Sequence, residues 1–193
     1  NDVVKYLIKC GADLILKGED GMTPLHIAAK CGNVGACFHL LNGTHLPNRY
    51  IDGLDDGGWT PMVWASEFNH IDVVKFLISK GADSLIKDSE QNIALHWAAF
   101  GGSVDIVEIF LNEGSDINSV NVHGDTPLHI AARQQKYSCV LLLLARGARS
   151  DVKNKNGELP RDCSHSPSSD IYKGITLNME ISALLTKFQD RTP

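Results

Sequence analysis

The fold is decided by the stretch Gly124-Asp125-Thr126-Pro127-Leu128-His129-Ile130-Ala131, the clearest of four copies of one motif. The other copies begin at Gly21, Gly58 and Gln91, so the first interval is 37 residues and the next two are 33. A degenerate fifth copy begins at Gly157, another 33 residues on. A fixed period of this length indicates a solenoid, in which each repeat buries its apolar face against its neighbours.

Each part of the motif has a local structural reason. Thr126-Pro127 places a capping residue before a proline at the first helical position, where the missing N–H is not needed. Small pairs such as Ala131-Ala132 leave one face of this helix slim enough for close stacking. A second, apolar helix follows in each repeat and ends at a recurring glycine, as at Gly114. The sequence therefore predicts an all-α repeat solenoid of helix-turn-helix units, joined by extended β-hairpin fingers such as residues 87–92.

The repeat spacing predicts one domain over residues 1–193. It divides into a partial repeat at 1–17, repeats at 18–54, 55–87, 88–120 and 121–153, and a C-terminal capping repeat at 154–193. The partial repeat supplies only a second helix, so we expect the solenoid to continue upstream. Extra residues before Gly58 place an insertion at about 44–54, on the finger side. The cap is expected to bury an amphipathic face made of Leu177, Ile181, Leu184, Leu185 and Phe188.

Composition excludes several classes of protein. The chain is 43% hydrophobic and 21% charged, which rules out disorder of the whole chain, and no apolar run is long enough for a membrane span. A net charge of −5 argues against nucleic-acid binding and favours a basic partner. The five cysteines are scattered and form no C-x-x-C pair, so we expect a reducing, intracellular compartment and no disulfide framework.

No catalytic constellation is present in the sequence. His26, His96 and His129 occupy the same position of different repeats, and stacked helices lie roughly 8–10 Å apart, too far for a shared zinc ion. We therefore expect structural roles for these histidines. No phosphate-binding loop, nucleophile elbow or paired-cysteine pattern occurs. The sequence predicts a binding module that is not an enzyme, with no catalytic residue, no metal site and no cofactor.

All three tryptophans of the chain fall in one adjacent pair of repeats. Trp64 and Trp97 are 33 residues apart, so they hold the same position of consecutive units, where Ile27 and Ile130 stand elsewhere. Each alone is explained by enlarged packing between repeats. Together they predict two indoles separated by a gap of roughly 8–10 Å. Trp59, five residues before Trp64, is expected to close a third side of an aromatic cage for an alkylated ammonium.

Acidic residues accompany the tryptophans. Glu67 lies three residues after Trp64, hence on the same helix face, where the other repeats place Lys30, Phe100 and Arg133. A carboxylate in the cage favours an ammonium that still carries an N–H, which predicts preference for mono- and dimethyl-lysine over trimethyl-lysine. Further acids are expected on the fingers, as a peptide-binding rim or as solvated charges, at Asp55, Asp56, Asp88 and Glu90.

The repeated motif resembles the ankyrin repeat across nearly the whole chain. A narrower resemblance rests on residues 55–67, on Leu95-His96-Trp97-Ala98-Ala99-Phe100 and on residues 122–133. These stretches look like the ankyrin region of the euchromatic histone-lysine methyltransferases, which methylate lysine nine of histone H3. Gln91 departs from the family pattern, in which glutamate is common.

The resemblance implies a function and a set of site residues. It implies a methyl-lysine reader for the histone H3 tail, mono- or dimethylated at lysine nine, and a separate SET domain that carries out methyl transfer. It further implies a nuclear protein that acts on chromatin. We also expect this piece to be monomeric and, from its composition, to contact neither nucleic acid nor membrane. The residues that match the family's methyl-lysine site are Trp59, Trp64, Glu67, Glu90 and Trp97. The alternative is a generic ankyrin scaffold that binds a folded protein on its concave face.

Overall fold

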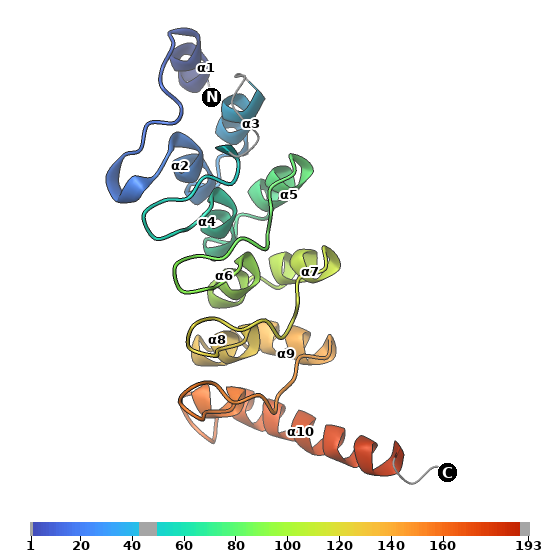
Figure 1. Cartoon of the computed structure of the whole chain (residues 1–193). Helices are drawn as coiled ribbons and strands as arrows, with labels where there is room; N and C mark the ends of the chain where they lie inside the picture. The colour runs from blue at the N-terminus through green and yellow to red at the C-terminus, as the bar shows by residue number, and fades with distance from the viewer. Residues whose placement is uncertain (1, 43–49, 190–193) are drawn as a thin grey trace.

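The computed structural model describes residues 2–42 and 50–189, and Figure 1 shows them as pairs of helices stacked along one axis. The N-terminus lies near one end of the stack and the C-terminus at the other. In chain order the helices are α1 (Asp2–Lys9), α2 (Pro24–Lys30), α3 (Val34–Asn42), α4 (Pro61–Glu67), α5 (Ile71–Ser79), α6 (Ala94–Gly101), α7 (Val104–Asn112), α8 (Pro127–Arg133), α9 (Tyr137–Ala145) and α10 (Asp170–Gln189). Short 3-10 turns lie at η1 (Glu19–Gly21) and η3 (Pro160–Cys163). The prediction of an all-α repeat solenoid is confirmed.

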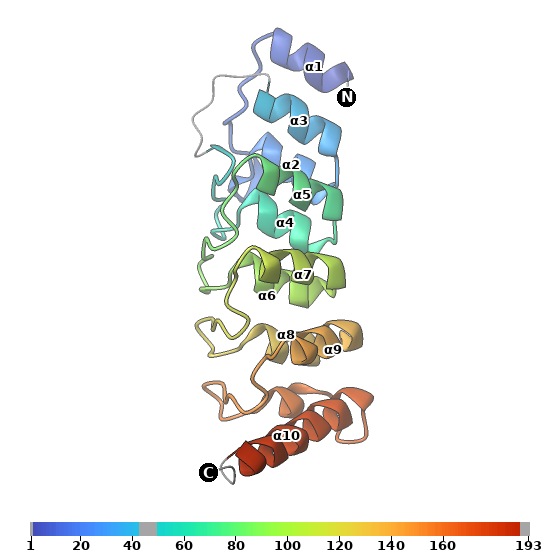
Figure 2. The same ribbon diagram turned by 90° about the vertical axis from the view of Figure 1, so that its right-hand side faces the viewer.

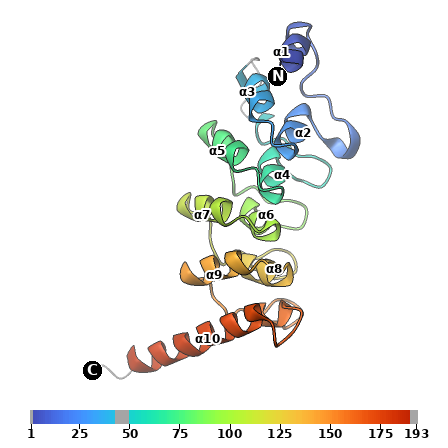
Figure 3. The same cartoon turned by 180° about the vertical axis from the view of Figure 1, so that it is seen from behind.

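The helices form two columns. One column contains α2, α4, α6, α8 and η3, each in contact with the next, and the other contains α1, α3, α5, α7, α9 and α10. Figures 2 and 3 show both columns, with the loops that connect successive repeats projecting along one edge of the stack. Because every repeat contacts mainly its two neighbours, equivalent positions of successive repeats lie side by side along the columns.

Threonine and histidine of the motif organise the start of the first-column helices. Thr126 Oγ1 accepts a hydrogen bond from the backbone N–H of His129 at 3.4 Å, while Thr126 N donates to His129 Nδ1 at 3.2 Å. The other ring nitrogen reaches the next repeat, since His129 Nε2 donates to the carbonyl of Glu158 at 3.2 Å and His26 Nε2 to that of Trp59 at 3.0 Å. Burial lowers the pKa of His96 to about 4, so its imidazole is neutral at pH 7. The prediction of structural histidines is confirmed.

Small residues bring the first-column helices close together. The paired positions Ala28-Ala29, Ala98-Ala99 and Ala131-Ala132 are buried, as are Ala65 and Ser66 of α4. The tightest approach involves Gly101, where an added Cβ would collide with the carbonyl oxygen of Glu67. The end of α6 is thereby fixed against the end of α4, next to the tryptophans.

One prediction about the connections needs correction, and another falls largely outside the described residues. The fingers are not β-hairpins: within the described residues no β-strand forms, and each finger is a tight turn closed by its own backbone, as in Asp88 N to Asn92 O at 2.9 Å. Four or five residues are too few for a regular ladder, so side chains hold the turn instead. Of the predicted insertion, residues 44–49 lie outside the described residues, but Tyr50 is buried and its hydroxyl donates to the carbonyl of Leu14 at 2.7 Å.

The capping helix is present, but its buried face differs from the prediction. Ile171 and Ile175 are buried, whereas Leu177, Ile181 and Leu184 are about half exposed. The helix leaves the stack at an angle, as Figure 1 shows, so only its first half meets the last repeat. The side chains of the remaining two predicted residues, Leu185 and Phe188, lie outside the described residues. None of the described helices is both long and apolar enough to cross a membrane.

Candidate functional site

The three tryptophans meet in one cluster where α4 and α6 begin. Trp59 precedes α4, Trp64 lies within α4 and Trp97 lies within α6. The ring of Trp59 contacts both others, with centroid distances of 4.6 Å to Trp64 and 4.0 Å to Trp97, at interplanar angles of 55° and 54°. These distances are in or near the range of attractive aromatic pairs. All three side chains are partly exposed, so the cluster is a surface feature.

The position of Trp59 differs from the prediction. We expected it to close the third side of a gap of roughly 8–10 Å between the indoles of Trp64 and Trp97. In the structure its ring touches both indoles. Contact removes apolar ring surface from water, which is favourable, and a loop residue can adjust its position more easily than a helical one. An ammonium therefore enters the cluster only if Trp59 shifts, or else binds across the exposed faces of the rings.

Two buried aspartates hold the other two indoles. Trp64 Nε1 donates to Asp55 Oδ2 at 2.8 Å, and Trp97 Nε1 donates to Asp88 Oδ2 at 2.9 Å. Asp55 is 8% exposed and Asp88 is 3% exposed. The prediction that they line a peptide rim is wrong, because their oxygens are already used within the protein. Asp56 remains exposed.

The second oxygen of each aspartate organises the finger. Asp55 Oδ1 accepts from the backbone N–H groups of Gly57 and Trp59 at 3.0 and 2.8 Å. Asp88 Oδ1 accepts in the same way from Glu90 and Asn92 at 2.9 and 2.8 Å. Each carboxylate thus links the turn of a finger to the indole of the following helix.

Glu67 supplies the acidic part of the site. It lies one turn after Trp64 on α4 and is partly buried. Its Oε2 atom is shielded from water and has no hydrogen-bond partner among the described residues. Burial raises the pKa of Glu67 above its ordinary value, and the positive charge of Lys30 partly opposes this. A shielded carboxylate oxygen without a donor is unfavourable, so Glu67 can gain from a ligand that supplies an N–H.

A lysine from the preceding repeat already contacts the cluster. The Nζ atom of Lys30 lies 4.1 Å from the ring centroid of Trp64 and 5.9 Å from that of Phe68. Both are within cation–π distance. The face of Trp64 is therefore oriented and exposed so that an ammonium can reach it.

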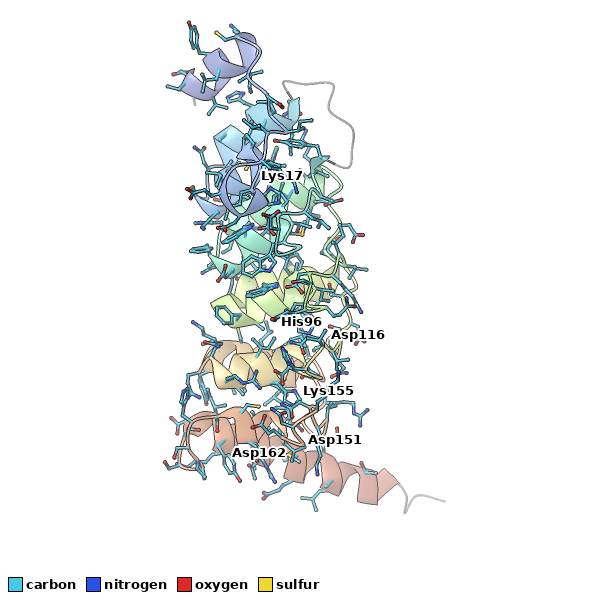
Figure 4. All side chains as sticks on the ribbon, turned by 60° about the vertical axis from the view of Figure 1, so that its left-hand side comes forward. Lys17, His96, Asp116, Asp151, Lys155 and Asp162 are labelled. Carbon is cyan, nitrogen blue, oxygen red and sulfur yellow. The ribbon has the colours of Figure 1, made fainter. Side chains whose placement is uncertain are left out.

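Glu90 lies on the tip of the next finger and is exposed. It also lines, with Trp97 and Arg133, a cavity of about 180 Å³ between two repeats. Successive finger tips are joined by backbone hydrogen bonds, for example Val122 N to the carbonyl of Glu90 at 2.9 Å and Lys155 N to that of His123 at 2.9 Å. Figure 4, in which His96 and Lys155 are labelled, shows the side chains along this edge. Glu90 can therefore add negative charge to a ligand at this edge, on the side of the cavity that Trp97 also lines.

Other chemistry finds little support in the part of the chain that the structure describes. Within residues 2–42 and 50–189, no three His, Cys, Asp or Glu side chains are grouped as metal ligands. The cysteines are free thiols, and burial raises the pKa of Cys37 to about 12 and that of Cys139 to about 11. Thiols of this kind are poor nucleophiles, because the thiolate is the reactive form.

The aspartate–indole hydrogen bonds and the contact of Lys30 with Trp64 were not predicted from the sequence. A signal for the first was present: aspartate stands nine residues before Trp64 and before Trp97, whereas Asn121 stands nine residues before Ile130. A signal for Lys30 was present as well, because it holds the position of Glu67 in the preceding repeat and equivalent positions of stacked repeats lie side by side.

Stacked helix pairs with a polar edge and a surface aromatic cluster define a solenoid-type binding protein. A family model for ankyrin repeats (3 copies) matches residues 1–88 and 83–155. The chain therefore belongs to the ankyrin-repeat family, whose arrays are protein-binding modules.

Curated relatives match over part of the chain only. It is 40% identical over 82 residues, 42% of this chain and 34% of the relative, to "26S proteasome non-ATPase regulatory subunit 10" of Dictyostelium discoideum. It is 42% identical over 57 residues to "DNA-binding protein RFXANK" of Homo sapiens, covering 30% of this chain and 20% of the relative. It is 33% identical over 78 residues to "B-cell lymphoma 3 protein homolog" of Mus musculus, covering 40% and 17%. The chain thus spans about a third or less of the length of these relatives.

Proposed function

We propose that this ankyrin array reads methyl-lysine on the histone H3 tail, mono- or dimethylated at lysine nine. The proposal rests on a cluster of three partly exposed indoles and on Glu67, which lies one turn along α4 from Trp64 and whose shielded Oε2 has no hydrogen-bond donor among the described residues. Aromatic faces attract a methylated ammonium, each by roughly 0.5–2 kcal/mol depending on desolvation. In the proposed complex the methyl groups lie against Trp64 and Trp97, and the remaining N–H donates to Glu67.

The structure of the cluster suggests how the ligand is admitted. The proposed ligand displaces the ring of Trp59 from its contact with the other two, because Trp59 belongs to a loop and has its indole in contact with both neighbours. The ammonium of Lys30 approaches Trp64 and is attracted to Glu67, so the incoming methyl-lysine competes with it for the same groups. Asp56 and Glu90, both exposed, attract the basic residues that flank the modified lysine.

The proposal extends to the parent protein. Following the resemblance of residues 55–67 and 122–133, we propose that the array is part of a larger histone-lysine methyltransferase that acts on chromatin in the nucleus. The module then holds the protein on nucleosomes that already carry the mark that its catalytic domain writes. Expression of the longer protein with and without these repeats, followed by chromatin fractionation, tests this part separately.

Peptide titration tests the reader function. Calorimetry with H3 tail peptides carrying zero, one, two or three methyl groups on lysine nine should rank mono- and dimethyl above trimethyl and far above unmethylated. Trp64→Ala and Trp97→Ala should each abolish this ranking. Ile27→Ala is the matched control, because Ile27 holds the equivalent position of a repeat without a tryptophan and is half exposed. Equal or absent binding across the series would contradict the proposal and leave a scaffold for a folded protein partner.

A further inference from the structure

The residue type at the first position of each finger varies with the residue that stands nine positions later in the helix. Asp55 and Asp88 stand nine residues before Trp64 and Trp97, while Asn121 holds the equivalent place before Ile130. All three use Oδ1 in the same way, since Asn121 Oδ1 accepts from the backbone N–H groups of His123 and Asp125 at 2.9 and 3.0 Å. Asparagine therefore suffices to form the finger.

The difference lies in the second atom of the side-chain head. Asn121 Nδ2 donates to Asn92 Oδ1 at 2.9 Å, and Asn154 Nδ2, one repeat further on, donates to Asp125 Oδ1 at 2.9 Å. Where a tryptophan follows, this second atom is a carboxylate oxygen that accepts from the indole. An indole N–H can only donate, so it requires an acceptor, and an asparagine amide in the same orientation would oppose donor to donor.

The use of aspartate needs a reason beyond the fold, because it places charge in a shielded site. Asp88 is 3% exposed, and burying a carboxylate is unfavourable unless several donors satisfy it. The donors are present: two backbone N–H groups, the Asn92 amide and the Trp97 indole. The indole is thereby anchored at its nitrogen, which fixes the direction in which the ring face points.

We infer that Asp55 and Asp88 are positioning residues of the binding site, each setting the orientation of one indole, Asp55 that of Trp64 and Asp88 that of Trp97. This inference rests on the proposed reader function for its ligand, but the anchoring of the rings is independent of it. The carboxylates contact no ligand. They pre-organise two of the three aromatic faces, and a pre-organised site loses less ordering entropy on binding.

The test compares Asp88→Asn and Asp55→Asn with Asp116→Asn in the whole 193-residue chain. Asparagine keeps the Oδ1 contacts of the finger, as Asn121 does, and removes the Oδ2 acceptor of the indole. In Asp88→Asn it also removes the longer Oδ2 contact of the Asn92 amide, at 3.2 Å. We expect each variant to bind an H3 peptide dimethylated at lysine nine about tenfold more weakly, in line with loss of one hydrogen bond to a charged group. Asp116→Asn changes an exposed aspartate whose Oδ1 accepts from the backbone N–H of Asn118 at 2.9 Å and that holds no indole, so it should leave the affinity within twofold.

A spectroscopic measurement separates positioning from general loss of structure. In ¹H–¹⁵N spectra the indole resonance of Trp97 should move upfield in Asp88→Asn and that of Trp64 in Asp55→Asn, each without the other, because a hydrogen bond to a carboxylate shifts the indole proton downfield. The double variant Asp88→Asn/Trp97→Ile reproduces the natural Asn121/Ile130 combination. It should recover the melting temperature of the parent but not its affinity.

The outcomes are distinguishable. Unchanged indole resonances in both aspartate variants would overturn the inference, as would undiminished peptide affinity in a chain that binds dimethyl-lysine. If the unaltered chain binds no methylated peptide, the reader function fails, while the indole resonances still decide whether the aspartates hold the rings. If the double variant, which lacks Trp97, binds as tightly as the parent, Trp97 is not part of the site and the positioning role of Asp88 is wrong.

Discussion

The repeats that carry the tryptophans differ from the repeat at 121–153 in how their polar groups are satisfied. In the latter, Asp125 and Arg133 form a bidentate pair at 2.6 and 3.1 Å. Burial raises the pKa of Asp125, but hydrogen bonds from Arg133 and Asn154 outweigh it, so the pKa is lowered overall. Glu67, which holds the position of Arg133 two repeats earlier, has a raised pKa and a shielded oxygen without a donor in the described residues.

The contrast teaches where binding capacity resides in such an array. At the same motif position, Arg133 forms an ion pair within the chain, whereas Glu67 has an oxygen without a donor among the described residues. A partly buried carboxylate that lacks a hydrogen-bond donor gains free energy when a ligand supplies that donor. The two repeats serve as controls for each other, because α4 and α8 are both seven-residue helices that follow a threonine N-cap and begin with proline.

The largest effect is expected from replacing Glu67 with the residue that stands at the same position two repeats later. Glu67→Arg replaces the carboxylate with a cation that repels the incoming ammonium and cannot accept its N–H. We expect the affinity for a dimethyl-lysine peptide to fall about a hundredfold, the equivalent of roughly 3 kcal/mol. Calorimetry on both proteins measures this, and a change of less than threefold would show that Glu67 does not face the ligand.

Breaking the neighbouring pair should affect folding and spare binding. In Arg133→Ala the buried Asp125 loses two guanidinium donors and keeps the hydrogen bond from the Asn154 amide. Because the Arg133 side chain is 40% exposed and water screens part of the interaction, we expect a loss of about 1–2 kcal/mol in the free energy of unfolding. Urea denaturation reports the loss, and peptide affinity should change less than twofold. A variant as stable as the parent would contradict the assigned importance of the pair.

Lowering the pH should separate the two acids. The pKa of Glu67 is raised by burial, so protonation removes the acceptor and weakens binding at a higher pH than for an ordinary glutamate. The pKa of Asp125 is lowered, so its stabilising contribution is present above the unfolded-state pKa and is lost only as the pH falls through the folded-state value. Affinity should therefore decline while the protein is still folded. Simultaneous loss of binding and of helical circular dichroism would disagree with this order.

Glu67→Gln tests the same acid from the side of stability. A raised carboxyl pKa means that the folded state binds the proton more tightly than the unfolded state, so the ionised form disfavours folding at pH 7. The variant should bind dimethyl-lysine about tenfold more weakly, with an affinity independent of pH, and should melt slightly higher than the parent. A lower melting temperature would indicate that Glu67 is retained for folding.

The smallest effect concerns the competing lysine. Lys30→Met removes an ammonium 4.1 Å from the Trp64 ring and keeps an unbranched side chain of similar length. We expect a two- to fivefold gain in affinity, consistent with a cation–π contact of about 0.5–1 kcal/mol at an exposed site. Glu67 should also titrate at a higher pH, because Lys30 lowers its pKa. A weaker-binding variant would make Lys30 part of the ligand contact.

The sequence predicted whatever follows from periodicity. The threonine–proline starts, the buried histidines and the equivalence of Trp64 and Trp97 depend on a 33-residue spacing, which stacking converts directly into neighbourhood. The position of Trp59 between the other indoles could not be predicted, because a loop side chain is oriented by its contacts. The buried face of α10 was not predicted correctly for a related reason. The helix packs through Ile171 and Ile175, which precede the predicted face that begins at Leu177.

The site was predicted in its members more than in their roles. The three tryptophans lie together, and Glu67 lies on the same helix as Trp64, whereas Asp55 and Asp88 are buried and bonded to the indoles and do not form the rim. Charge in a sequence is ordinarily assigned to the surface, and only the hydrogen-bond partners of a buried carboxylate reveal another role.

The central claim is that the tryptophan cluster receives a methylated ammonium, and the indole resonances test it directly. The chain contains only three tryptophans, so three indole signals report on the site. During titration with an H3 peptide dimethylated at lysine nine, all three signals should move along one binding curve, while the unmethylated peptide leaves them nearly unchanged at the same concentration. Equal shifts with both peptides, or none with either, would contradict the claim.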